Sequence, residues 1–305
     1  MNPITKLSEL AEHVRSRGSM TRVAVAAADD SHTITAIARA VREGWAHAIL
    51  HGHKARIEQV CQSESIDPAL FEIIDHADDV TATKAATLQV KSGAADVLMK
   101  GLVRTDVFLK AVLDKQQGLL PPGAVMSYTC ALEIPRYNKL MFISDTAVLP
   151  HPDLNQKAAM IDYSVKMARR LGIQTPKVAL ISATEKVSPS MPSTLDYAQL
   201  CSMNKRGQIK NCLIDGPLDV FLACDPEAGE IKGVNTPIKG EADVLIFPDL
   251  ESANSFYKGL MLFAGAELAG LIQGTVKPVV VMSRSESAAS KYYCLALACL
   301  MAEEI

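Results

Sequence analysis

The sequence has 305 residues, 49% of them hydrophobic, and a formal net charge of −3. A chain of this length can bury a large core and is long enough for two domains. Charges of both signs are interspersed and aromatic residues make up only 5%. These features argue against a basic surface for nucleic acid and against a stacking platform for bases.

Cysteine usage and the N-terminus suggest where the protein works. The seven cysteines are scattered, mostly in apolar segments, and form no Cys-x-x-Cys pair, which is typical of reduced, buried thiols. No basic start followed by an apolar stretch is visible at the N-terminus. The longest apolar run, 292–302, is shorter than the roughly 20 residues that span a bilayer. We therefore expect a cytoplasmic protein that does not bind membranes.

The first part of the chain alternates short strand-like runs with longer helical patterns. Strands are predicted at 22–28, 46–51, 71–75 and 95–99. Helices are predicted at 31–43, 54–62, 81–91 and 105–115, with Thr105 as the cap of the last one. Alternation at this spacing predicts βαβ units and a parallel sheet.

The pattern then changes. Two strand-like runs, 125–133 and 139–145, are joined by the turn sequence 134–138, which predicts an antiparallel hairpin. The α/β rhythm resumes with helices at 153–171, 194–203, 254–264 and 287–301, and with strands at 177–182, 212–214, 243–247 and 278–282.

The last strand and helix resemble the first part in rhythm. We therefore expect them to complete the first sheet, so that the second domain is an insertion. The predicted first domain comprises 1–128 and 271–305, and the second comprises 129–270 with the hairpin. The fold class is α/β.

Several familiar motifs are absent from the sequence. It has no G-x-x-x-x-G-K-[ST], no two glycines separated by one residue and no G-x-S-x-G, so the P-loop, dinucleotide and hydrolase fingerprints are missing. His51 and His53 have no clustered acidic or cysteine ligands nearby. A turn after a strand explains these histidines better than a metal site, and we expect no metal.

The segment 279–287 is the first candidate site. A buried strand ends and a helix begins within a few residues, and Ser283, Arg284, Ser285 and Glu286 lie between them. Parallel sheets bind ligands at the carboxyl ends of their strands, and helix N-termini favour oxyanions. Arg284 adds a planar fork that matches phosphate. The simpler alternative is a serine-rich helix cap with a surface arginine.

The segment 97–106 has a similar organisation. Gly101 lets the backbone turn closely where a strand ends, and Lys100 and Arg104 can both face an anion there. The alternative is an ordinary turn with solvated basic residues.

Two further strand ends carry polar residues. Asp145 ends the strand-like run 139–145 and Thr146 follows it, and Asp145 can act as a general base or cap the helix after Pro152. Asp249, which we interpret as a loop cap, follows the strand at 243–247. Asn254 and Lys258 are four residues apart and share a helix face.

These segments together resemble the phosphate acetyltransferase and phosphate butyryltransferase family. The matching motifs run in order from about residue 97 to the C-terminus. They include Ser-Asp-Thr-Ala-Val at 144–148, Ile-Asp-Gly-Pro-Leu-Asp at 214–219, the run at 245–258, and Gln-Gly-x-x-Lys-Pro at 273–278 followed by Ser283 and Arg284.

The resemblance implies a two-domain fold like that of isocitrate and isopropylmalate dehydrogenases, usually dimeric, with the site in the cleft. It implies reversible transfer of an acyl group between coenzyme A, as substrate, and inorganic phosphate, without a metal. By the same resemblance, Ser283 assists the transition state and Arg284 holds phosphate. Lys100 and Arg104 are weaker candidates for the coenzyme A phosphates or the acceptor phosphate.

Two positions depart from the acetyl branch of that family. Its proposed base, an Asp seven residues after the Ser, is Ser290 here, which leaves Asp145 and Glu286 as replacements. The Cys that often follows its strand-end Asp is Thr146. The motifs lie closer to the butyryl branch, so we expect butyryl or another short chain to be preferred over acetyl.

Two other functions remain open at the level of sequence. One is an NAD(P)-dependent hydroxy-acid oxidoreductase of the same fold, which would need metal-binding carboxylates. No compact set is visible, although Asp215, Asp219 and Asp225 can be argued. The other is a non-enzymatic protein whose two lobes close on an anion.

Overall fold

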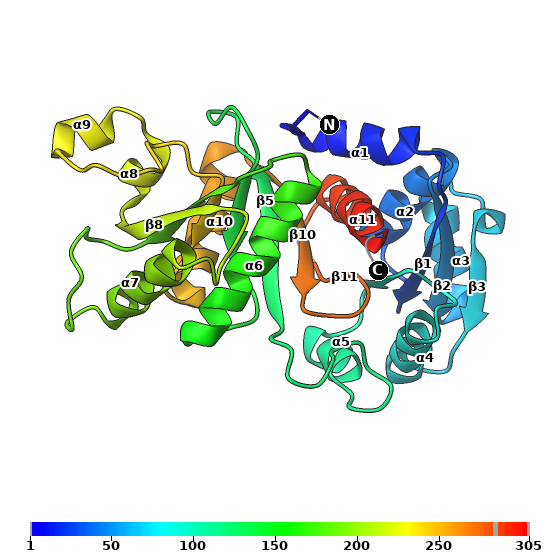
Figure 1. The fold of residues 1–305 in the computed structure, drawn as a ribbon. Helices are drawn as coiled ribbons and strands as arrows, with labels where there is room; N and C mark the ends of the chain where they lie inside the picture. The colour runs from blue at the N-terminus through cyan, green and yellow to red at the C-terminus, as the bar shows by residue number, and fades with distance from the viewer. Residues whose placement is uncertain (1, 283–285, 304–305) are drawn as a thin grey trace. The chain divides into compact units, whose positions relative to one another are not determined.

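A computed structural model describes residues 2–282 and 286–303 (Figure 1). The chain divides into two compact units. The N-terminal unit comprises Leu7–Met126 and Leu268–Ile305, and the inserted unit comprises Ser127–Glu267 together with Met1–Lys6. The expected first domain had included residues 1–6. They pack with the inserted unit instead, where the N–H of Ile4 donates to the carbonyl of Leu171 at 2.8 Å.

The N-terminal unit is built on a mostly parallel sheet. Its strands are β1 (Thr21–Ala26), β2 (Ala46–Gly52), β3 (Glu72–Asp75), β4 (Val97–Lys100), β10 (Glu267–Gln273) and β11 (Val279–Val280). They lie in the order β3-β2-β1-β4-β11-β10. Neighbours from β3 to β11 are parallel, and β10 runs antiparallel to β11. The last strand thus joins the first sheet, whereas β10 was not predicted.

The helices of this unit cover the sheet in two groups. They are α1 (Leu7–Ser16), α2 (Ser31–Arg42), α3 (Lys54–Ser63), α4 (Asp79–Lys91), α5 (Thr105–Val112) and α11 (Ala288–Ala302), with a short 3₁₀ turn at Pro68–Leu70. α11 packs against α1 and α2, while α4 packs against α5. α1 was not predicted. The prediction of Thr105 as a cap is wrong, because Arg104 is the N-cap residue of α5 and no side chain caps it.

The inserted unit contributes five strands. Its strands are β5 (Ser127–Glu133), β6 (Met141–Ser144), β7 (Lys177–Ile181), β8 (Leu213–Leu218) and β9 (Val244–Ile246), in the order β5-β6-β9-β7-β8. The predicted hairpin is confirmed: β5 and β6 are antiparallel, with Cys130 opposite Ile143. The remaining pairs are parallel.

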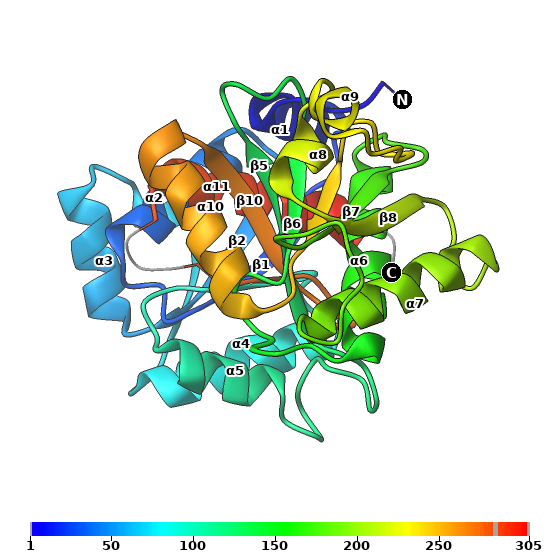
Figure 2. The same cartoon turned by 90° about the vertical axis from the view of Figure 1, so that its left-hand side faces the viewer.

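Five helices accompany these strands. They are α6 (Leu154–Arg170), α7 (Pro192–Lys205), α8 (Val220–Cys224), α9 (Ala228–Lys232) and α10 (Leu250–Ala264). α6 packs on β5, β6 and β9, α7 on β8, and α10 on β6 (Figure 2). The short helices α8 and α9 were not predicted. α10 begins before the expected residue 254 because Asp249 caps it, accepting from the N–H of Ser252 at 2.8 Å.

The α/β fold class predicted from the sequence is therefore confirmed. Within residues 2–282 and 286–303, no helix combines the length and the apolar character needed to cross a membrane.

A chain of hydrogen bonds crosses the N-terminal unit at the end of β2. His51 is buried, its Nε2 lies 2.7 Å from Oε1 of Gln89, and its Nδ1 lies 3.0 Å from Nε2 of His76. With Nε2 donating to Gln89, Nδ1 accepts from His76. Burial lowers the pKa of His51, and the neighbouring His76 adds to this, while the hydrogen bond to Gln89 opposes it. The folded state therefore favours the neutral imidazole.

This burial predicts a loss of stability in mild acid. Because the folded pKa of His51 is below the unfolded value of about 6.5, its contribution is complete above that pH and is lost as pH falls. Urea unfolding at pH 7.5 and 5.5 should show a loss attributable to His51 of up to about 1.4 kcal/mol. His51→Gln should remove this component. His47→Gln, at an exposed position on the same strand, should leave it in place, and equal pH dependence in both variants would contradict the assignment.

Candidate active site

The candidate residues fall into two groups, one in each unit. The N-terminal unit carries Lys100, Gly101, Arg104 and Glu286. The inserted unit carries Asp145, Thr146, Asn254 and Lys258. Ser283, Arg284 and Ser285 lie outside the described residues.

The first group lies where the strand order of the N-terminal unit reverses. β2 and β3 follow β1 on one side, and β4 lies on the other side of β1. In open parallel sheets, ligands bind outside the carboxyl ends of the strands at such a switch point. The strands whose carboxyl ends meet here are β1, β4 and β11.

The connections after β1 and β4 touch directly at this point. The N–H of Gly101 donates to the carbonyl of Ala26 at 2.8 Å, and that of Leu102 donates to Ala27 at 2.7 Å. A Cβ at Gly101 would lie 2.1 Å from the Ala27 carbonyl oxygen. Glycine is therefore required here by close backbone contact, as the sequence suggested.

Lys100 is buried at the end of β4, with 3% of its surface exposed. Its Nζ donates to the carbonyl of Gly101 at 3.2 Å. A buried ammonium is costly unless acceptors or an anion compensate it. Lys100 therefore places a buried ammonium group at the carboxyl end of β4.

Arg104 is placed differently from Lys100. Its guanidinium is largely exposed and grips Asp106 with two hydrogen bonds, of 2.9 and 3.1 Å. The pKa of Asp106 is lowered by these hydrogen bonds. The guanidinium of Arg104, which was expected to face an anion, is thus paired with a neighbouring carboxylate. This agrees with the simpler alternative of an ordinary turn with solvated basic residues.

The start of α11 lies beside the start of α2. The carbonyl of Glu286 is 3.1 Å from Nδ1 of His32, in the first turn of α2. Ser287 caps α11 by accepting from the N–H of Ser290 at 3.0 Å. Ser290, which stands where the acetyl branch has an Asp, is buried in this cap.

In the inserted unit, Asp145 holds the connection after β6. Its carboxylate accepts from the N–H groups of Tyr128 at 3.0 Å and of Ala147 and Val148, each at 2.8 Å. Burial raises the pKa of Asp145, while the backbone donors oppose that rise. The alternative that Asp145 caps the helix after Pro152 is wrong, because Asp153 caps α6.

Thr146 and Asn254 are brought together in the same unit. The Nδ2 of Asn254 donates to the carbonyl of Thr146 at 2.9 Å, which ties the first part of α10 to the connection after β6. Thr146 is buried, whereas Lys258 is exposed. Asp249 is the N-cap of α10, which confirms its interpretation as a cap.

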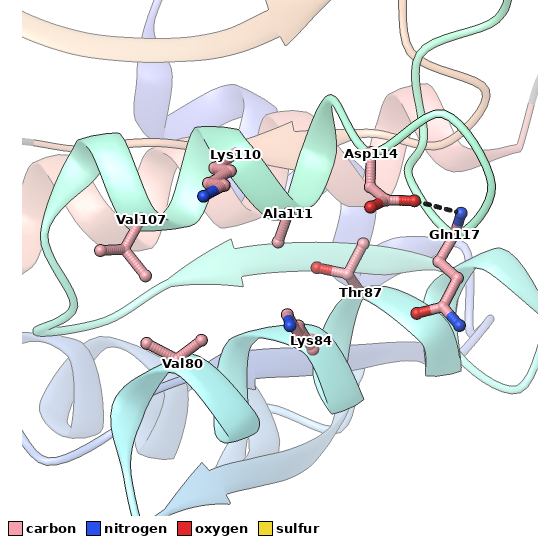
Figure 3. A pocket seen from close by; sticks show the side chains of 8 residues that line it. All are labelled: Val80, Lys84, Thr87, Val107, Lys110, Ala111, Asp114 and Gln117. Atoms are coloured by element: carbon pink, nitrogen blue, oxygen red, sulfur yellow. Dashed lines mark hydrogen bonds between the residues drawn. The ribbon is translucent and has the colours of Figure 1, made fainter.

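A separate pocket of about 290 Å³ lies between α4 and α5 (Figure 3). Lys84 from α4 and Lys110 from α5 line it, together with apolar side chains such as Val80 and Val107. Asp114 at its end accepts from the N–H groups of Gln116 and Gln117 at 2.9 and 2.8 Å, so it stabilises the turn after α5. None of the candidate residues lines this pocket.

A buried ion pair near the carboxyl end of β1 was not predicted from the sequence. Lys291 in the first turns of α11 donates to Asp30, the N-cap residue of α2. The signal in the sequence was the position of Lys291 directly before the apolar run 292–302. A charged side chain beside such a run is expected to be buried only if it has a partner.

Comparison with known proteins identifies the family. The profile described as phosphate acetyl/butaryl transferase matches residues 78–299. The chain is 39% identical to phosphate butyryltransferase from Clostridium acetobutylicum, covering 98% of this chain and 99% of the relative. It is also 39% identical to phosphate acetyltransferase from Thermotoga maritima, covering 97% and 99%. The chain belongs to the phosphate acetyltransferase and phosphate butyryltransferase family.

Solved structures agree with this assignment. A branched-chain phosphotransacylase from Enterococcus faecalis V583 superposes with a TM-score of 0.81 at 27% identity, covering 93% of this chain and 99% of that one. A 4-hydroxythreonine-4-phosphate dehydrogenase from Klebsiella pneumoniae matches with a TM-score of 0.54 at 12% identity, covering 93% and 100%. The second match shows a shared fold with a dehydrogenase and nothing about activity.

The contacts of Asp145 predict a structural role for its carboxylate. Asp145→Asn places an NH₂ group against a backbone N–H, so we expect a stability loss of about 1.5–3 kcal/mol. The kcat of the folded variant should stay within about tenfold of wild type, an amount worth about 1.4 kcal/mol of barrier. Urea unfolding and steady-state kinetics measure the two effects.

Asp153→Asn is the matched control for this variant, because Asn caps a helix about as well as Asp. It should change neither quantity appreciably. A kcat loss of 100-fold or more in Asp145→Asn, with unchanged stability, would instead identify Asp145 as the base.

Proposed function

We propose that this chain transfers a short acyl group reversibly between coenzyme A and inorganic phosphate. The observation that carries the proposal is its similarity over nearly the whole chain to enzymes named for this transfer. The geometry of the N-terminal unit supports it, because Lys100 is buried at a strand-order switch point where anionic ligands bind in this class of sheet.

The proposed chemistry needs a phosphate oxygen held in line with a thioester carbonyl. That oxygen attacks the carbonyl carbon, the C–S bond breaks, and the departing sulfur takes up the proton that phosphate gives up. The products are an acyl phosphate and free coenzyme A. Orientation of the two substrates can be worth about 7–11 kcal/mol.

In this proposal Arg284 clamps phosphate through its planar guanidinium, and Ser283 donates to the developing oxyanion. One such donor is worth about 2.7–4 kcal/mol. Lys100 adds positive charge at the same sheet edge, and Ser285 is a further donor. Glu286 is the preferred base of the two carboxylates considered, because Asp145 already accepts three backbone hydrogen bonds. The proposal involves coenzyme A as a substrate and no metal ion or other cofactor.

A short acyl chain, butyryl first, is the proposed substrate. A relative named for butyryl transfer and one named for acetyl transfer are equally identical to this chain. The proposed preference for butyryl therefore follows from the motifs at 144–153, 215–219 and 283–291. Each added methylene in an apolar pocket is worth about 1–3 kcal/mol. A clear preference is therefore expected, without strict exclusion of acetyl-CoA.

We also propose that the chain works in the cytoplasm as a homodimer or higher homo-oligomer. The exposed side chains of Leu262 and Phe263 at the end of α10, 76% and 86% accessible, support self-association. Sedimentation of the purified chain tests this directly.

The activity is tested by thiol release from acetyl-, propionyl-, butyryl- and hexanoyl-CoA, with and without phosphate. We expect phosphate-dependent release that survives a chelator, with kcat/KM highest for butyryl- or propionyl-CoA. If kcat/KM were tenfold higher for acetyl-CoA than for the longer acyl chains, the proposed chain length would be wrong but the proposed reaction would stand. A hydroxy-acid-dependent change in NADP absorbance without thiol release would favour an oxidoreductase, and anion binding without turnover would favour a binding protein.

Two substitutions test the assigned roles. Arg284→Ala should raise the KM for phosphate and lower turnover, because the clamp is lost. Ser283→Ala should lower mainly kcat, by about 10²–10³. Circular dichroism establishes that each variant is folded, and unchanged kinetics in folded Ser283→Ala would exclude its role as the oxyanion donor.

A further inference from the structure

The pocket between α4 and α5 changes in polarity from one end to the other. We call it the α4/α5 groove, and its lining includes Val80 and Lys84 on α4 and Val107, Lys110 and Asp114 from α5 and the turn after it. The two valines face each other at one end, the lysines follow, and Asp114 lies at the other end (Figure 3). An apolar end of the groove thus leads directly to two cations.

The spacing of these residues explains why they share one groove. Val80 and Lys84 are four residues apart on α4, and Val107 and Lys110 are three apart on α5. Side chains three or four residues apart lie on the same face of a helix. Each helix therefore contributes one valine and one lysine to the same wall-lined space.

The ammonium groups of the groove lack a protein partner. Lys84 and Lys110 are exposed, and within residues 2–282 and 286–303 neither forms an ion pair or a hydrogen bond. Oδ1 of Asp114 accepts from two backbone N–H groups, and the pKa of Asp114 is lowered mainly by these hydrogen bonds and also by the charge of Lys84. With two lysines against one aspartate in its lining, the groove carries net positive charge.

The apolar end of the groove lies nearest the carboxyl edge of the sheet. α4 begins four residues after β3 ends, and α5 begins five residues after β4 ends. The first turns of both helices therefore lie beside the carboxyl ends of parallel strands, where sheets of this kind bind ligands. Val80 and Val107 belong to these first turns. The groove thus starts at the edge that carries Lys100 and runs away from it between the helices.

The occupant must combine negative charge with an apolar part. A volume of about 290 Å³ is close to the lower end of the about 300–1,000 Å³ found for small-molecule sites, so an organic molecule fits better than a lone ion. Of the two substrates in the proposed reaction, only acyl-CoA joins phosphate groups to apolar groups. Arg104, which was expected to meet those phosphate groups, is paired with Asp106 instead.

We propose that the α4/α5 groove binds the phosphate-bearing part of the acyl-CoA substrate. The order of groups along coenzyme A matches the groove. The methyl groups of the pantetheine arm pack on Val80 and Val107, and the phosphate groups pair with Lys84 and Lys110. The adenine then reaches the far end, where Asp114 can accept from its amino group. The inference rests on the proposed function, and these residues bind substrate without touching the reacting atoms.

The chain offers a matched control for the two lysines. Lys91 in the last turn of α4 and Lys115 in the turn after α5 are exposed as well, and neither lines the groove. Reversing both of their charges changes the net charge of the protein by the same amount as reversing Lys84 and Lys110. The control pair therefore measures how much of any effect comes from long-range attraction of an anionic substrate.

The experiment compares full-length wild type with Lys84→Glu/Lys110→Glu, Lys84→Gln/Lys110→Gln and the control Lys91→Glu/Lys115→Glu. Thiol release gives kcat/KM for butyryl-CoA and for butyryl-pantetheine, which has no phosphate groups, and the KM for inorganic phosphate. Calorimetric titration with coenzyme A gives Kd without turnover. Urea midpoints establish that each variant is folded. The Gln pair removes the charges without reversing them, and it decides the result if the Glu pair does not fold.

We expect Lys84→Glu/Lys110→Glu to lower kcat/KM for butyryl-CoA and to raise the Kd of coenzyme A by about tenfold or more, with a smaller change in the same direction for the Gln pair. Its kcat/KM for butyryl-pantetheine and its KM for phosphate should stay within about threefold of wild type, because neither measurement involves the phosphate groups of coenzyme A. The control pair should stay within about threefold of wild type throughout.

Four results would overturn the proposed groove. They are wild-type kcat/KM and Kd in the variants of Lys84 and Lys110, an equal loss in the control pair, an equal loss with butyryl-pantetheine, and a change confined to the KM for inorganic phosphate. Absence of thiol release by the wild type contradicts the proposed function instead, and the titration with coenzyme A then still decides whether the groove binds it.

Discussion

The organisation of the N-terminal unit depends on one close backbone contact. The connections after β1 and β4 meet where the strand order reverses, and a Cβ at Gly101 would strike the Ala27 carbonyl at 2.1 Å. Two backbone hydrogen bonds hold the same connections together. Because the chain places β2 and β3 on one side of β1 and β4 on the other, the contact lies at the switch point where sheets of this kind bind ligands.

Two buried lysines lie near this edge, together with the largely buried carboxylates of Asp29 and Asp30. Lys100 and Lys291 are both buried, and Asp30 is the carboxylate that pairs with Lys291. Buried ion pairs add little or no stability compared with apolar side chains of the same size.

The inserted unit uses its polar strand ends differently. The carboxylate of Asp145 accepts hydrogen bonds from three backbone N–H groups, and Asn254 donates to the Thr146 carbonyl. These contacts shape the connection after β6 and leave little of the Asp145 carboxylate for proton transfer. An aspartate at the end of a strand can thus hold a loop in place through hydrogen bonds and still look like a general base in the sequence. Both the structural and the catalytic role favour a short acidic side chain.

The sequence by itself determined the α/β alternation, the hairpin β5–β6 and the return of β11 to the first sheet, because hydrophobic periodicity and turn residues are local signals. It also identified the family through ordered motifs. It missed α1 and β10, and it assigned residues 1–6 to the wrong unit. Only the tertiary structure decided that Arg104 grips Asp106, that Asp145 holds a loop and that Lys291 pairs with Asp30. The last pair joins residues 261 positions apart, and partners so distant in sequence leave no periodic pattern, so the fold alone brings them together.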